Sequence, residues 1–331
     1  MNRRSSSSLP LAKAISGFLQ YKAAEGLSPN TIASYDHDLK LWLEYAGDLP
    51  IDKITSQKLQ SYFLWLRNDY KSRQISGQPR PLAPKTIHNF YVSLSAFFTW
   101  ASRELSIPHP LKAVPSPKFE ATPVEPFTRE EVEKMLKACE MCKEADTASC
   151  RRFTMRRSTG RRDQAIILTL LDTGLRASEL SALTVGDVDL KTGKILIKHG
   201  RLGGAKGGKG RTVFLGKAAR SAVWRYLAER EDGESPEAPL FLVKKDRPMN
   251  KVALRLVIGH LGKKVDIKKC HPHRFRHTFA ITYLRSGGDL FTLQSLLGHS
   301  TLDMVQHYAR IAEIDVAQAH KRASPADNWR L

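Results

Sequence analysis

Six polar side chains in the second half of the chain have the types needed to cut a phosphodiester bond. They are two arginines, two histidines, a lysine and a tyrosine: Arg176, Lys206, His273, Arg276, His299 and Tyr308. Nucleophilic attack adds negative charge to a five-coordinate phosphorus. Guanidinium groups suit that charge because each can donate two parallel hydrogen bonds to the non-bridging oxygens. We therefore expect Arg176 and Arg276 to stabilise the transition state electrostatically.

The other four side chains supply a nucleophile and the proton transfers that it needs. A phenol has a pKa of about 10, so Tyr308 needs nearby positive charge and a proton acceptor to react at neutral pH. His273 and His299 are of the type that accepts the phenolic proton or donates to the phosphate. Lys206, on a flexible loop, can protonate the leaving 5′ oxygen. This set requires no metal ion and no nucleotide, so we expect no cofactor.

Each of these residues has an ordinary explanation when it is taken alone. A single histidine is usually a satisfied polar group, and Tyr308 alone would be a core aromatic with its hydroxyl at the surface. His273 and His277 are also spaced as two metal ligands on one helical face. Arg276 beside them would repel a cation, however, and no acidic third ligand is near in sequence. The combination, and not any one residue, favours phosphodiester cleavage.

The charge of the chain indicates a polyanionic partner. The 331 residues include 53 Lys+Arg and 33 Asp+Glu, a formal net charge of +20. Such a field attracts nucleic acid. No apolar run approaches the roughly 18 residues that span a bilayer, so a membrane partner is not expected. Residues 1–10 read as a flexible tail because they lack the apolar core of a signal peptide. We expect a cytoplasmic, nucleoid-associated protein.

Four helical stretches predict a small all-α domain at residues 11–107. The first runs from Leu11 to Glu25, and later ones follow Ser28-Pro29, Thr55 and Pro84, each with apolar residues at helical spacing. Residues 108–126 contain six prolines. Proline-rich segments are semi-rigid, so we expect a linker here. Two domains joined in this way would be able to close around something long and thin.

Residues 127–331 predict a second domain that is mainly α with one small antiparallel sheet. A capping box at Thr128–Glu131 opens it, and an apolar helix at 163–172 stops at Gly174. Two strands, 194–198 and 212–215, flank a connection in which residues 201–211 hold five glycines. The remaining sequence predicts helices at 216–230, 249–264, 272–286, 289–297, 301–309 and 313–322.

Three short boxes in this domain resemble the tyrosine site-specific recombinase (phage integrase) family, in its Xer-like form. Residues 173–180, Thr-Gly-Leu-Arg-Ala-Ser-Glu-Leu, resemble the family's first-arginine box. Residues 273–280, His-Arg-Phe-Arg-His-Thr-Phe-Ala, resemble its His-x-x-Arg-His box. Residues 296–299, Leu-Leu-Gly-His, with Tyr308 nine residues after His299, resemble the closing box that carries the nucleophile. The likeness extends over nearly the whole chain.

The resemblance implies a role for each of the six residues. Arg176 and Arg276 would grip the scissile phosphate, and Tyr308 would form a 3′-phosphotyrosyl bond. The general base would be His273, and the general acid would be the hairpin lysine. Lys206 fits that lysine because of its offset from residues 211–215, with Lys209 as the competing candidate. His299 would hydrogen-bond the phosphate, and His277, the second histidine of its box, would be structural.

The resemblance also implies partners and an assembly. The first domain would be a SAM-like core-binding domain, and the substrate would be double-stranded DNA carrying a specific recombination site. Strands would be exchanged through a Holliday junction. Residues 314–322 predict an amphipathic helix that, in similar proteins, packs into a neighbouring protomer of a homo-tetramer. The alternative is that this helix packs on its own domain.

One segment departs from short members of the family. Residues 140–162 look like an insertion that adds Cys142, Cys150 and six arginines, next to Cys139. A zinc site would want a fourth ligand at suitable spacing, and none is obvious. We favour a surface loop whose arginines contact phosphates. The fourth cysteine of the chain is Cys270, and all four are expected to be free thiols.

Two other functions stay open from the sequence. A type IB topoisomerase-like enzyme would share the chemistry and relax supercoils, and a DNA-binding regulator could carry an inactive site. Among recombinases, the insertion and the serine-rich start favour a mobile-element or phage integrase over a chromosome-dimer resolvase. The sequence does not reveal the target site, because readout depends on which side chains reach base edges.

Overall fold

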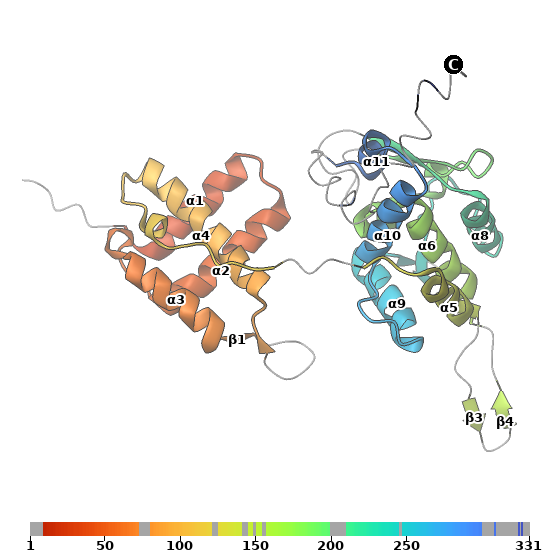
Figure 1. The fold of residues 1–331 in the computed structure, drawn as a ribbon, viewed down its shortest axis with the longest axis horizontal. Helices are drawn as coiled ribbons and strands as arrows, with labels where there is room; N and C mark the ends of the chain where they lie inside the picture. Colours follow the sequence, from red (N-terminus) through yellow and green to blue (C-terminus); the bar gives the residue numbers. More distant parts are fainter. Residues whose placement is uncertain are drawn as a thin grey trace, which may run out of the picture. The chain divides into compact units, whose positions relative to one another are not determined.

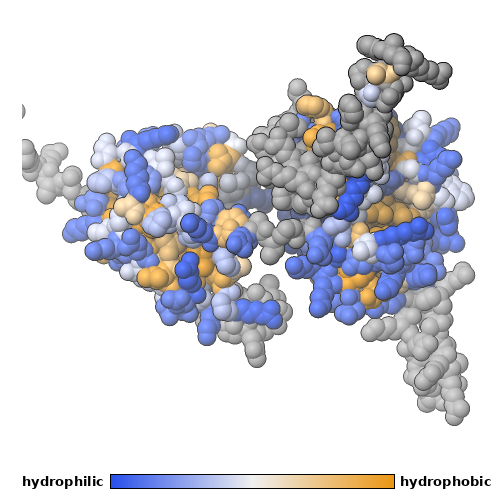
Figure 2. Space-filling model, viewed as in Figure 1, coloured by the Kyte–Doolittle hydropathy of each residue, from blue (hydrophilic) through white to orange (hydrophobic). Residues whose placement is uncertain are grey.

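The computed structural model divides the chain into two compact units, residues 1–123 and 124–331 (Figure 1). It describes residues 9–72, 80–120, 125–140, 145–147, 150–153, 157–198, 210–244, 247–299, 308, 324 and 326. The visible described surface of both units is largely hydrophilic, with separate apolar areas (Figure 2). No helix among these residues is long and apolar enough to cross a membrane.

Unit 1 contains the four helices that the sequence predicts. They are α1 (Leu11–Ala24), α2 (Pro29–Ala46), α3 (Ser56–Asn68) and α4 (Pro84–Glu104). Side-chain caps start two of them: the Ser28 hydroxyl accepts from the Thr31 amide, and the Thr55 hydroxyl from the Lys58 amide. A short antiparallel pair, β1 (Lys71–Ser72) and β2 (Arg80–Pro81), lies between α3 and α4 in sequence.

Aromatic side chains fill the core of unit 1. Trp42 and Phe97 are fully buried, and the Phe97 ring meets Phe18 edge-on with centroids 5.6 Å apart. Such edge-to-face contacts add to the stabilisation from apolar burial. The core also takes in Leu111 and Val114, beside a 3₁₀ turn at Pro110–Ala113. The beginning of the proline-rich segment therefore packs with unit 1.

Unit 2 is built around α6 (Gly160–Thr173), which packs against α5 (Arg129–Glu140), α8 (Lys217–Leu227) and α10 (Pro272–Arg285). The helices α9 (Lys251–Lys264) and α11 (Leu290–Leu297) were also predicted from sequence. The six-residue α7 (Ala177–Ala182) was not. The helices predicted at 301–309 and 313–322 lie outside the described residues, except that Tyr308 is helical.

The predicted antiparallel sheet is the pair β5 (Lys194–Ile197) and β6 (Arg211–Phe214), in a register that places Ile197 opposite Arg211. Two further strand pairs of unit 2 were not predicted. They are β3 (Ala145–Thr147) with β4 (Cys150–Phe153), and β7 (Leu242–Lys244) with β8 (Arg247–Pro248). The architecture is thus mainly α with two domains, as expected, and the described residues include more small antiparallel sheets than the one predicted.

Candidate active site

The turn between α6 and α7 places Arg176. Helix α6 ends at Gly174, whose φ of 60° lies in the left-handed region that favours glycine. A Cβ at Gly174 would also lie 2.6 Å from Cδ1 of Phe279. Two residues later, Arg176 is the N-cap of α7, and its backbone amide donates to Oε2 of Glu179 at 2.8 Å. The side chain of Arg176 therefore projects from a fixed corner.

Helix α10 places Arg276 together with two histidines. Pro272 occupies its first turn, and Nδ1 of His271 accepts from the Arg274 amide, so the helix begins just before His273. Positions 273, 276 and 277 are three and four residues apart and share one face. The Arg276 side chain is 1% exposed. It donates to the carbonyl oxygen of Gly174 at 2.9 Å and to that of Leu297 at 2.7 Å.

Arg276 also faces His299. One of its Nη2 contacts is with Nε2 of His299, at 2.7 Å. Because an arginine only donates, His299 accepts there, which a neutral imidazole can do. Burial lowers the pKa of His299 to about 4, assisted by the charges of Arg276, Arg176 and Arg211. Burial and the charge of Arg176 lower the pKa of Arg276 itself to about 10. Arg276 stays charged at pH 7 and His299 stays neutral.

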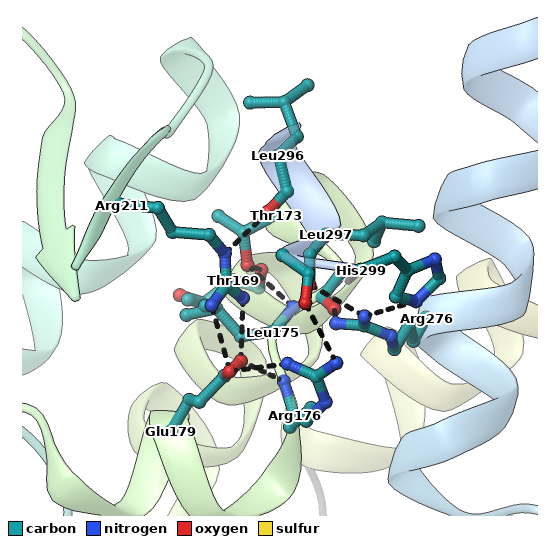
Figure 3. A network of polar contacts seen from close by, with 12 residues as sticks. Thr169, Thr173, Leu175, Arg176, Glu179, Arg211, Arg276, Leu296, Leu297 and His299 are labelled. Atoms are coloured by element: carbon teal, nitrogen blue, oxygen red, sulfur yellow. Dashed lines mark hydrogen bonds and ion pairs between the residues drawn. The ribbon is translucent and has the colours of Figure 1, made fainter. Parts of the chain in front are cut away.

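Glu179 and Arg211 complete the network, and sequence reasoning did not single them out. The fully buried carboxylate of Glu179 accepts from Arg176 Nη1 at 2.8 Å and from Arg211 Nη1 and Nη2 at 2.9 and 2.7 Å. Burial would raise the pKa of Glu179, but Arg211 and Arg176 outweigh it and hold that pKa at about 2. Figure 3 shows the two guanidiniums converging on this carboxylate. The available signal was an acidic residue inside the first-arginine box.

Tyr308 lies in the same neighbourhood. Its side chain is nearly buried, at 4% exposure, and its ring stacks on His299 with centroids 6.2 Å apart and planes 13° apart. Burial raises the pKa of Tyr308, while the charges of Arg276 and Arg176 and a hydrogen bond with Arg276 lower it in part. The two arginines thus favour the phenolate that burial disfavours. Tyr308 and the arginines around it therefore belong to the same chain.

Of the two histidines of α10, His277 contacts the tyrosine ring and His273 contacts His277. The His277 ring meets Tyr308 edge-on at 5.2 Å between centroids, and His273 at 4.7 Å. Burial lowers the pKa of His273, followed by the charges of Arg276, His271 and Arg176. His273 is therefore neutral near pH 7 and able to accept a proton. His277, expected to be structural, contacts the rings of both His273 and Tyr308.

Lys206 and Lys209 lie outside the described residues. The strand that follows them, β6, begins at Arg211, whose guanidinium is part of the network above. The structure thus brings together Arg176, His273, Arg276, His299 and Tyr308 and leaves the choice of lysine to experiment.

The described residues contain neither a metal-binding cluster nor a disulfide-bonded cysteine pair. Within the described part of the chain, no group of three or more His, Cys, Asp or Glu side chains could hold a metal ion. Cys139 and Cys270 are free thiols, and burial raises their pKa values to about 12 and about 11. The side chains of Cys142 and Cys150 are not among those described.

Buried guanidiniums and imidazoles around a phenol define a class of enzyme that breaks phosphodiester bonds through a tyrosine. Two family models match the chain. The "Phage integrase family" covers residues 125–314, and "Phage integrase, N-terminal SAM-like domain" covers residues 15–105. The chain belongs to the phage integrase family of tyrosine recombinases, enzymes that cut and rejoin DNA.

Named relatives agree with this membership. "Tyrosine recombinase XerC" of Pelobacter propionicus is 32% identical over 320 residues, which cover 96% of both chains. The Tn1549 transposon integrase in complex with circular intermediate DNA aligns with a TM-score of 0.69 at 22% identity, over 91% of this chain and 95% of that one. The XerH recombinase bound to palindromic difH aligns with a TM-score of 0.69 at 20% identity, over 96% of each chain. The two structures show a shared fold, and the relatives favour a recombinase over a topoisomerase-like enzyme or an inactive regulator.

Proposed function

We propose that this recombinase cuts a specific site in double-stranded DNA through Tyr308. The phenolic oxygen attacks phosphorus and forms a 3′-phosphotyrosyl bond, and the 5′ oxygen leaves with a proton. The reverse reaction, with the 5′ hydroxyl of another strand, rejoins the DNA through a Holliday junction. The bond energy is conserved in the covalent link, so the step needs no metal or nucleotide. The convergence of Arg276, His299 and Tyr308 in one buried cluster is the observation that carries this proposal.

Each neighbour has a part in this step. Arg176 and Arg276 stabilise the charge on the non-bridging oxygens, and neutral His299 donates to one of them. His273 takes the phenolic proton, and Lys206, or Lys209 in its place, protonates the leaving oxygen. Because the His277 ring contacts both His273 and Tyr308, His277→Gln is the matched comparison for His273→Gln.

Covalent trapping tests the nucleophile. The protein is expressed in a bacterial host, complexes are stopped with detergent, and DNA ends bound to protein are sequenced. A duplex of the mapped sequence, nicked just beyond the cleavage position, then serves as a suicide substrate. We expect an adduct with the wild type and with Tyr283→Phe, a tyrosine that packs on Phe279 instead. We expect none with Tyr308→Phe, and an adduct with that variant would refute the assignment.

The outer face of α9 supports a duplex partner. Its exposed side chains include the cations Lys251, Arg255 and Lys263, and the apolar Val252 and Leu256. Cations suit phosphates, and apolar groups suit thymine methyls. Arg255 and Lys263 also line an open cleft of about 440 Å³. We further propose that unit 1 binds the same duplex and that the proline-rich segment lets the two units close around it.

We propose that four copies assemble on DNA by exchanging residues 314–322. An open groove of about 570 Å³ between α5, α6 and α10 suits the apolar side of such a helix, since its lining includes Leu136, Leu168, Leu171 and Phe279. Deleting residues 313–331 should leave cleavage of the suicide substrate intact and abolish tetramers on DNA, as measured by sedimentation. Tetramers formed by the deletion variant would contradict the exchange.

We propose a mobile-element role over chromosome-dimer resolution, on the strength of the insertion at 140–162, and action in the cytoplasm on the nucleoid. The sequence of the trapped ends distinguishes the roles. Junctions at the borders of one element support the first, and a single site where chromosome replication terminates supports the second.

A further inference from the structure

Arg211 has no chemical role in the reaction proposed above, yet it contacts separate parts of the site. It is the first residue of β6, and its side chain is 10% exposed. Five hydrogen atoms on its guanidinium point in fixed directions, so an arginine with several partners fixes their relative positions. Figure 3 shows Arg211 between Glu179 and the end of α11.

The first connection runs to Arg176. Arg211 forms a two-pronged ion pair with Glu179, with N–O distances of 2.9 and 2.7 Å. This fork fixes the plane of the carboxylate. Glu179 Oε1 then accepts from the Arg176 side chain, and Oε2 from the Arg176 amide. The direction of the Arg176 guanidinium thus depends on the orientation that Arg211 gives to Glu179.

The second connection runs to His299. Nε of Arg211 donates to the carbonyl oxygen of Leu296 at 2.7 Å, in the last turn of α11. Gly298 ends that helix with a φ of 63°, and a Cβ there would lie 3.0 Å from Nη1 of Arg211. The guanidinium therefore packs flat against the turn that delivers His299. Arg176 Nη2 donates to the Gly298 carbonyl, at 3.3 Å, so the same turn meets both arginines.

We propose that Arg211 is a positioning residue for cleavage: by holding Glu179 and the turn at 296–298, it sets the places of Arg176 and His299 around the phosphate. This inference rests on the proposed function. Each of the three guanidinium nitrogens of Arg211 donates to a partner within the protein, so we expect this residue to act without a contact to DNA. Arg211 is also the first residue of β6, the strand that follows the segment with Lys206 and Lys209 in sequence. Its ion pair with Glu179 therefore holds the start of this strand at the candidate site.

Arg211→Lys tests this because it keeps the charge and removes the fork. If Arg211 only neutralises Glu179, the lysine should suffice. If it positions Arg176, the single-turnover rate of adduct formation should fall about 30- to 100-fold, the cost of a misplacement of about 1 Å. The affinity for the suicide duplex, measured by anisotropy, should change less than about twofold, because each Arg211 nitrogen already has a partner within the protein.

A double-mutant cycle with Arg176→Ala identifies the route. Where two residues act as one unit, their effects are not multiplicative. We expect Arg211→Lys to cost a smaller fold-loss in the Arg176→Ala background than in the wild type, because only its hold on the turn that delivers His299 then remains to be lost. The same fold-loss in both backgrounds, or a wild-type rate for Arg211→Lys alone, would overturn the inference. Arg225→Lys, on the exposed side of α8, is the matched control and should cleave at the wild-type rate.

Two checks separate this result from others. Circular dichroism and thermal unfolding show whether Arg211→Lys is folded; if it is not, Arg211→Gln enters the same cycle. Failure of the proposed function gives a different pattern, because Tyr308→Phe would then form the adduct. A wild-type adduct that is absent with Tyr308→Phe, together with a fully active Arg211→Lys, would remove the positioning role alone.

Discussion

The two units bury different kinds of side chain. Among the described residues, the core of unit 1 is apolar and aromatic, with Asp38 as its buried charged residue. Unit 2 buries a set of charged groups that includes Arg162, Asp163, Glu179, Asp187, Arg274 and Arg276. Burying charge is costly unless each group is paired and hydrogen-bonded. Unit 1 thus uses burial for shape, whereas unit 2 also buries paired charges, among them Glu179 and Arg276 of the candidate site.

The largest expected effect is a loss in the free energy of unfolding of unit 1 when its aromatic core is disrupted. Phe97→Ala removes a fully buried ring from a packed aromatic cluster and should lower the free energy of unfolding of unit 1 by about 4 kcal/mol. Hydrogen exchange of the full chain should speed up in α1 and α4 and stay unchanged in α6 and α10. Equal acceleration in both units would show that they unfold together.

The matching change in unit 2 should affect chemistry instead. Arg276→Lys keeps a charge but loses the fork that reaches Gly174, Leu297 and His299. Adduct formation should slow by about 10²- to 10³-fold, or about 3 to 4 kcal/mol of transition-state stabilisation. Arg225→Lys, on the exposed face of α8, serves as control. A loss of less than tenfold, that is, less than about 1.4 kcal/mol, would contradict the role of Arg276.

Acid should destabilise unit 2 through His299. The folded pKa is about 4 and the unfolded one about 6.5, so between these values the unfolded state binds more protons. Stability contributed by neutral His299 is complete above pH 6.5 and falls by about 2 to 3 kcal/mol as pH drops to 4. Urea unfolding at several pH values, followed by fluorescence, measures it. His299→Gln should show a smaller decline, and equal slopes for the two proteins would refute the linkage.

The smallest effect is expected at an exposed ion pair of unit 1. Lys40 Nζ lies 2.7 Å from Asp36 Oδ2, four residues earlier on α2. Asp36→Ala should lower the free energy of unfolding by about 0.3 kcal/mol, and high salt should remove the difference. A loss above about 1 kcal/mol would mean that surface charge matters more to unit 1 than its apolar core suggests.

Much of the fold was predictable because its signals are local. Apolar spacing and capping residues such as Ser28, Thr55 and Pro84 predicted the helices of unit 1. The strands at 194–198 and 212–215 were predicted to within a residue. The pairs β1–β2 and β7–β8 were not, because strands of two or three residues have no usable periodicity. Helix α7 was missed for the same reason, because six residues are too few to show a helical period of apolar residues.

The site was predictable only in part. The residues in the three boxes could be named from their order, and the structure brings Arg176, His273, Arg276, His299 and Tyr308 together. Glu179 had one local signal, its place inside the first-arginine box, but its pairing with Arg211 had none, because a glutamate and an arginine 32 positions apart resemble surface residues until the fold brings them together. Their importance comes from a long-range ion pair, which no local pattern contains.

The segment between α5 and α6 is joined at its base. The amide of Arg157 donates to the carbonyl oxygen of Glu140 at 2.9 Å, so the segment leaves and re-enters the unit at one place. Gly160 fits tightly against Cys139 just beneath. A segment closed at its base in this way can be lengthened, replaced or fused to a fluorescent tag while the helices below keep their register.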